Sequence, residues 1–193
     1  MKKFLLIAFI GLASVFANAQ IPTSGNVFFG YSYSGGDVDM RGSGLIPQTH
    51  TTNLNGWEGS LEGKFLPWVG LVADIAGQYG SHQLFVCSPV TCTAAPTQVS
   101  ASRYTAMFGP RLSVSVWKLT PFAHALVGAA HVSDTGGGRS TSDTSFSTAI
   151  GGGIDYKLFK GVAWRFQGDS LHTWFYGGSQ NHVRLSTGLV LRF

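Results

Sequence analysis

The sequence predicts an all-β fold, an eight-stranded antiparallel up-and-down transmembrane β-barrel. Three observations favour it. Long segments alternate apolar and polar residues with period two, charged residues fall on one face of these segments, and connections alternate between short and long. The composition agrees, because only 11% of the 193 residues are charged, below the roughly 25% of an average soluble domain.

The chain begins with the features of a secretory signal peptide. Lys2 and Lys3 precede a short apolar run, and the small residues "ANA" offer cleavage after Ala19. We expect residues 1–19 to be removed and residues 20–193 to form one barrel domain. A signal anchor is the alternative, which the short run and the cleavage site disfavour. Losing two lysines lowers the formal net charge from +4 to +2, and no basic cluster suggests a nucleic-acid partner.

Eight segments carry the alternation. The last is the clearest, because six residues from Val183 to Phe193 share one face without a break. We expect strands at residues 25–34, 54–65, 69–79, 102–116, 121–132, 145–158, 162–174 and 182–193. Short connections fall at residues 66–68, 117–120 and 159–161. Longer ones cover residues 35–53, 80–101, 133–144 and 177–181. An even strand number, with short turns at one end and long loops at the other, is typical of an outer-membrane barrel.

The charges test this interpretation. With the apolar face outward, the charged strand residues all point inward: Glu58, Glu62, Lys64, Asp74, Arg103, Arg111, Asp155, Lys157, Arg165, Asp169, Arg184 and Arg192. The other mature charges fall in loops or turns: Asp37, Asp39, Arg41, Lys118, Asp134, Arg139, Asp143 and Lys160. A charge facing lipid near the midplane costs about 2–4 kcal/mol, so this segregation fits lipid outside. In the fifth strand we expect Ala123, Ala125, Val127 and Ala129 to point outward, which places His124 inside. The opposite phase is also open.

Aromatic residues gather at two levels, as expected of interfacial girdles. At the short-turn end they are Phe65, Trp68, Trp117, Phe122, Phe159, Trp164 and Phe193. At the long-loop end they are Tyr31, Tyr33, Trp57, Tyr79, Tyr104, Phe146, Trp174, Phe175 and Tyr176.

The inward charges predict an interior ion-pair cluster, because an eight-stranded barrel is just wide enough for side chains to fill it and buried charges need partners. The predicted members are Glu58, Glu62, Asp74, Arg111, Asp155, Arg165, Asp169 and Arg184. Two interpretations stay open. The cluster is either a polar plug that satisfies itself or a narrow gated ion path whose members exchange partners. The second predicts that replacing Arg111 by Ala raises conductance.

Cys87 and Cys92 lie close together in "FVCSPVTCTAAP". In an oxidising compartment this spacing favours a small loop disulfide. A two-thiolate metal site is the alternative, but no nearby His or further Cys completes it. We expect no metal and no cofactor.

The segment "STGLVLRF" resembles the C-terminal strand by which the barrel-assembly machinery recognises outer-membrane barrels. Leu185, Leu189, Leu191 and Phe193 match this signature, and Thr187 departs from it. The segments "SFSTAIGGGIDYKL" and "VAWRFQGDSLHTWF" resemble the OmpA-like barrel family. The resemblance implies a monomer in the outer membrane, in contact with lipid and lipopolysaccharide. It also implies a structural role with a narrow, low-conductance pore. Because no second domain follows Phe193, we expect no peptidoglycan-binding module of the kind that full-length OmpA-type proteins carry.

Two other functions remain as alternatives. The segment "HVSDTG" resembles the His-x-Ser-Asn region of lipid A deacylases, in which His131 would activate Ser133. Asp134 stands where that family has Asn, and three strands follow the motif instead of one, so we expect no enzyme activity. The long loops are rich in Ser, Thr, Gly and Asn, which suits a surface protein that adheres through them.

Overall fold

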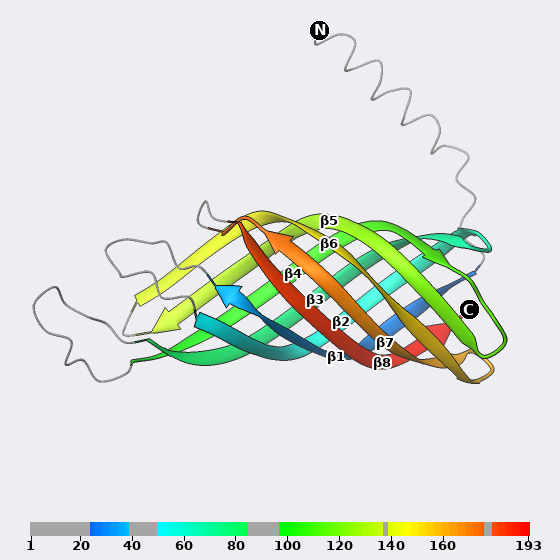
Figure 1. The fold of residues 1–193 in the computed structure, drawn as a ribbon, viewed down its shortest axis with the longest axis horizontal. Helices are drawn as coiled ribbons and strands as arrows, with labels where there is room; N and C mark the ends of the chain where they lie inside the picture. The colour runs from blue at the N-terminus through cyan, green and yellow to red at the C-terminus, as the bar shows by residue number, and fades with distance from the viewer. Residues whose placement is uncertain (1–23, 39–49, 85–96, 137–138, 176–178) are drawn as a thin grey trace, which may run out of the picture.

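The computed structural model describes residues 24–38, 50–84, 97–136, 139–175 and 179–193. They form a closed antiparallel barrel in the order β1 to β8, with β1 paired to β8 (Figure 1). The strands are β1 (Ser24–Val38), β2 (His50–Leu66), β3 (Val69–Leu84), β4 (Thr97–Ser113), β5 (Leu119–Gly136), β6 (Arg139–Phe159), β7 (Val162–Thr173) and β8 (Gln180–Arg192). The predicted fold class is confirmed. Among the described residues, no helix is long and apolar enough to cross a membrane.

Several strands are longer than the sequence predicts. β5 and β6 run through the expected loop at residues 133–144 and stay paired as far as Gly136 opposite Arg139. The prediction failed there because Ser- and Thr-rich residues were interpreted as loop. Beyond the lipid a strand needs no apolar face. The hydrogen bonding between β5 and β6 therefore continues there, although the alternation of apolar and polar residues that identifies a strand in the sequence has ended. Asp37, Asp134 and Asp143 accordingly lie in strands and not in loops.

The connections at the other end are short, as predicted. β2 and β3 are joined by two residues, and so are β6 and β7, where Gly161 has a φ of 81°. Its left-handed conformation suits a glycine, which has no Cβ to clash. β4 ends earlier than expected, at Ser113, and a bridge between Val116 and Leu119 closes the turn before β5. We call this the short-turn end.

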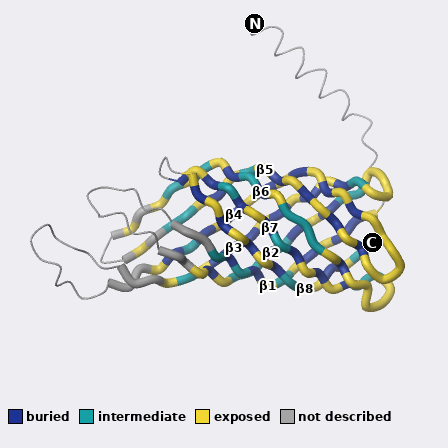
Figure 2. The backbone as a smooth tube through the Cα atoms, viewed as in Figure 1, coloured by how far each residue is buried: buried dark blue, intermediate teal, exposed yellow. Residues whose placement is uncertain are grey.

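Residues along each strand alternate between the two faces of the barrel, as the alternation of exposed and buried residues in Figure 2 shows. Large apolar side chains such as Phe29, Phe108, Ile150 and Phe166 are exposed on the outside. His124 of β5 is buried, which settles the open phase of that strand. The outward face is therefore an apolar surface of the kind that lipid solvates.

Two of the aromatic predictions were wrong. Phe122 and Phe175 are buried inside the barrel and do not belong to the girdles. Phe122 lies on the same face of β5 as His124, so its strand phase, and not its distance from the turn, decides its side. Tyr176 lies outside the described residues. The remaining girdle residues are exposed or half-buried.

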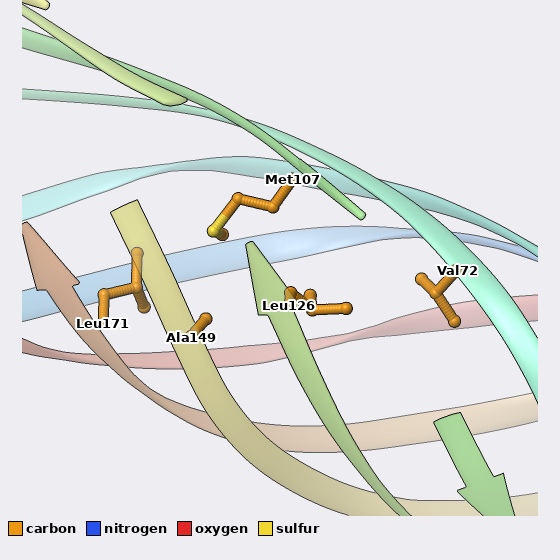
Figure 3. Packing of buried hydrophobic residues seen from close by; sticks show 5 residues of the cluster. All are labelled: Val72, Met107, Leu126, Ala149 and Leu171. Carbon is orange, nitrogen blue, oxygen red and sulfur yellow. The ribbon is translucent and has the colours of Figure 1, made fainter. Parts of the chain in front are cut away.

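The barrel interior also holds an apolar cluster, shown in Figure 3. One side chain comes from each of five neighbouring strands, β3 to β7: Val72, Met107, Leu126, Ala149 and Leu171. All five are at most 3% exposed. A smaller cluster joins Phe28, Ala163 and Val190. The inward face is thus a mixture of apolar and charged side chains.

Candidate functional site

Arg184 of β8 is the centre of the charged interior. Its Nη1 donates a hydrogen bond to Asp74 Oδ1 of β3 at 2.9 Å, and its Nη2 donates to Asp169 Oδ2 of β7 at 2.7 Å. Its Nε lies 3.3 Å from Glu58 Oε2 of β2. The Arg184 side chain is fully buried. One guanidinium therefore ties carboxylates from three other strands to β8.

Neutral side chains complete this group of three carboxylates. Gln167 Nε2 donates to Glu58 Oε1 at 2.8 Å and to Asp169 Oδ2 at 2.9 Å. The Ser186 hydroxyl donates to the other oxygen of Glu58. These donors matter because buried carboxylates are tolerated only when cations and hydrogen bonds together replace their hydration.

His124 links this group to a second one. Its Nε2 lies 2.8 Å from Asp169 Oδ1, and its Nδ1 lies 3.3 Å from Arg111 Nη2. A guanidinium nitrogen can only donate, so Nδ1 must accept and the ring proton sits on Nε2, where it is donated to Asp169. The imidazole is therefore a bridge from Arg111 on β4 to Asp169 on β7.

Glu62 of β2 anchors the second group. Its Oε2 accepts from Arg111 Nη1 at 3.1 Å and from Asn26 Nδ2 at 2.6 Å. Asn26 in turn accepts from Arg165 Nη2 through its Oδ1 at 3.4 Å. The chain of contacts thus continues from β4 through β2 and β1 to β7.

Arg165 and Asp155 form the third group. Arg165 donates from Nε at 2.7 Å and from Nη2 at 3.0 Å to the two oxygens of Asp155, a two-pronged geometry that fixes both side chains. Arg192 adds a contact to Asp155 at 3.2 Å. The guanidiniums of Arg165 and Arg111 also lie over the Phe122 ring, 4.6 and 4.3 Å from its centroid. Phe122, which the sequence placed in the girdle, is therefore part of this network.

Glycine makes room for the network where strand and side chain meet. A Cβ on Gly151 of β6 would lie 2.0 Å from Asp169 Oδ1 and 2.5 Å from the Gly168 carbonyl oxygen. Only a residue without a side chain lets the Asp169 carboxylate reach both Arg184 and His124. Glycine at this position thus relieves crowding inside a small barrel.

The structure brings all eight predicted cluster residues into the barrel, each at most 3% exposed. Five are acidic and three are basic, and Arg192 and Lys64 near the rim add two further cations. Lys157, also expected inside, lies exposed. Sequence reasoning missed the neutral partners: Asn26, Gln167, Ser186 and Phe122. Their inward strand phase was the available signal, but polar residues without charge also occur outside, so phase alone did not single them out.

Other predicted sites stand apart from this network. Leu185, Leu189, Leu191 and Phe193 are exposed on the outer face of the C-terminal strand, and their role in assembly stays a prediction. His131 is exposed, with Nδ1 2.7 Å from Thr144 Oγ1. The signal peptide and the pair Cys87 and Cys92 lie outside the described residues. No group of three or more potential ligands is placed to hold a metal within the described part of the chain.

No family model and no curated protein matches the sequence. Among solved structures, Ail, the attachment invasion locus protein of Yersinia pestis, matches with a TM-score of 0.55 at 15% identity, over 88% of this chain and 98% of Ail. Neisserial surface protein A matches with a TM-score of 0.58 at 12% identity, over 87% of this chain and 97% of that one. At these identities the likeness shows the fold, which is that of outer-membrane barrels. The fold expected of an OmpA-like barrel is therefore shown, whereas membership of that family is not shown by sequence.

Proposed function

We propose that this chain is a structural outer-membrane protein whose barrel is closed by its own interior network. The observation that carries the proposal is the fully buried Arg184, which holds Glu58, Asp74 and Asp169 from three other strands. The Arg184 guanidinium links carboxylates from different sides of the barrel interior and takes the place of water around them. The proposal includes gating, because ions can pass through the barrel only when these ion pairs exchange partners.

Conductance of the refolded mature chain, residues 20–193, in planar bilayers tests the proposal. We expect the unaltered protein to be silent or to show only rare, weak openings. Arg111→Ala should raise the conductance, because it removes the cation beside Glu62 Oε2, which keeps only its hydrogen bond from Asn26, and the guanidinium that bridges to His124. A heat-dependent gel shift verifies that each protein has folded.

Leu126→Ala is the matched control, because it removes buried volume from the apolar cluster without removing an ion pair. Its conductance should stay at the level of the unaltered protein. Frequent, steady openings of the unaltered protein would contradict a closed barrel. Equal conductance in Arg111→Ala and Leu126→Ala would show that volume, and not ion pairing, controls closure.

A second candidate function is attachment at the cell surface. The observation that favours it is the unequal strand length, since β6 has 21 residues and β7 only 12. The outer face of the β5–β6 extension carries hydroxyls and an imidazole in cross-strand pairs: Thr135 with Ser140, and His131 with Thr144. Ail, named for attachment and invasion, shares the fold. An ordered polar wall suits contact with a partner better than a flexible loop does.

Shortening this hairpin tests the second candidate. Val132 pairs with Asp143, so replacing residues 133–142 by Asn-Gly would close the hairpin with a two-residue turn and leave the barrel intact. Bacteria displaying the shortened protein should adhere to epithelial cells less than those displaying the full protein. Equal adhesion, at equal surface amounts, would remove this candidate.

A further inference from the structure

A cavity of about 250 Å³ lies inside the barrel at the short-turn end, next to the second and third groups of the network. Its charged lining consists of Lys64, Arg111, Arg165, Arg192, Glu62 and Asp155. Four cationic and two anionic side chains give the lining a formal side-chain charge of +2. The group around Arg184, by contrast, carries more carboxylates than cations.

Two cationic donors of residues that line the cavity are not used by the network. Nε of Arg111 and Nη1 of Arg165 are buried and have no hydrogen-bond partner among the described residues. The two side chains are 1% and 0% exposed. A buried donor left without a partner is unfavourable, and more so when it is charged. Arg111 and Arg165 both line the cavity, so an anion there would lie beside guanidiniums whose donors are not all used.

The two guanidiniums are held in fixed orientations. Each is anchored to a carboxylate, Arg111 to Glu62 and Arg165 to Asp155, and both lie over the Phe122 ring. Because their orientation is set before any ligand arrives, little side-chain entropy is lost when an anion binds. Glu62 Oε1 also lacks a hydrogen-bond partner, but this oxygen packs against Gly70 of β3. A Cβ on Gly70 would lie 2.7 Å from it.

The rim of the cavity supplies the approach. Arg192 is 29% exposed, and Lys64 is half-buried, with its Nζ 3.0 Å from Ser113 Oγ. Both cations can be reached from solvent at the end that faces the periplasm in outer-membrane barrels. The hydroxyls of Ser113 and Thr120 add neutral donors to the wall.

We propose that this cavity is a binding site for a small oxyanion, a phosphate or carboxylate group that enters from the periplasmic side. The flat guanidinium fork matches both groups, so the shared chemistry is the oxyanion and not its source. This site goes beyond the proposed structural role, and neither the closed barrel nor the surface hairpin requires it.

Calorimetric titration of the mature protein in phosphatidylcholine nanodiscs tests the site, with pyrophosphate and citrate as separate probes. The double variant Lys64→Gln with Arg192→Gln removes the rim cations and should weaken binding by about tenfold or more. Lys118→Gln with Lys160→Gln is the matched control, since it removes the same charge from exposed turns that do not line the cavity. There we expect a change within about twofold. Tighter binding of pyrophosphate or of citrate identifies the phosphate or the carboxylate as the preferred group.

A second measurement reports on the buried donors themselves. The Arg111 Nε–H signal in a ¹⁵N-correlated NMR spectrum should shift during the titration, because an anion bound in the cavity would lie beside this guanidinium. Adsorption of the anion on the rim alone would leave it unmoved. The proposal is overturned by the absence of binding at millimolar probe, by equal weakening in the two double variants, or by an unmoved Arg111 signal.

Discussion

The barrel interior contains two regions that share strands and differ in everything else: the charged network around Arg184 and the apolar cluster of Figure 3. On β5, Leu126 follows His124 at the next inward position, and on β7, Leu171 follows Asp169 in the same way. Neither region touches lipid. Both regions are therefore compatible with the barrel wall. Whether an inward position carries a charged or an apolar side chain depends on the neighbouring side chains and not on lipid.

The difference lies in how the two regions hold the strands together. The charged network uses directed contacts, in which a specific nitrogen of Arg184 meets a specific oxygen of Asp74 or Asp169. The apolar cluster fills space between β3 and β7 without such pairing. Loss of one member should leave an uncompensated charge in the first region and a cavity in the second. Four substitutions separate these outcomes.

The largest effect is expected from Arg184→Met. It keeps most of the side-chain volume but leaves Glu58, Asp74 and Asp169 without their common cation. Removing one partner of a buried ion pair costs about 3–5 kcal/mol, so we expect a loss of about 4 kcal/mol in the free energy of unfolding. Urea unfolding of the refolded protein in lipid micelles, followed by tryptophan fluorescence, measures it.

The pH dependence of that loss distinguishes charge from packing. Acid protonates the uncompensated carboxylates of the variant, so its deficit relative to the unaltered protein should shrink as the pH falls. A deficit that stays the same from neutral to acid pH would mean that Arg184 acts through its volume, and the contrast between the two regions would be lost.

The next largest effect is expected from Leu126→Ala in the apolar cluster. Leu126 is 1% exposed, and its truncation leaves a cavity among neighbours on four other strands. The loss should be about 3 kcal/mol and independent of pH. Val127→Ala is the control on the same strand, because Val127 is 41% exposed on the lipid face. If both changes cost the same, the interior cluster would contribute no more than the lipid-facing surface.

The same contrast explains how far the sequence predicts this molecule. The number of strands and the short turns follow from the period-two alternation, and the inward side of Glu58, Asp74 and Arg184 follows from the rule that lipid excludes charge from the outer face. That rule is strong because each exception costs several kcal/mol. It acts only where lipid is present, so the extension of β5 and β6 beyond it could not be predicted.

Inside the barrel no comparable rule exists. An inward Leu126 or Met107 breaks the expected polar interior without cost, because neighbouring apolar residues surround it. Phe122 was placed outside by its nearness to a turn, although the phase that puts His124 inside also puts Phe122 there. The partners of each charge depend on the barrel register and shear, which bring Arg184 to Asp74 across 110 residues of sequence.

A moderate effect is expected from Gly151→Ala, which tests how tightly the wall fits the network. The added Cβ would lie 2.0 Å from Asp169 Oδ1, so the carboxylate must move away from Arg184 or the strands must separate. Overpacking of this kind costs about 1–3 kcal/mol. Gly168→Ala is the matched control, because its Cβ points outward and first meets Leu185 Cδ2 at 3.4 Å. Equal unfolding free energies for the two variants would show that Asp169 has freedom to shift.

The smallest effect is expected from Arg192→Gln, at the rim of the same network. Arg192 contacts Asp155 at 3.2 Å but is 29% exposed, and Asp155 keeps its two bonds from Arg165. Solvent screens such a pair, so the loss should be below about 1 kcal/mol and should fade as salt is added. A loss as large as that of Arg184→Met would mean that the rim belongs to the closed interior. A small loss would instead fit a rim at which the Arg192 guanidinium can contact an anion bound in the cavity.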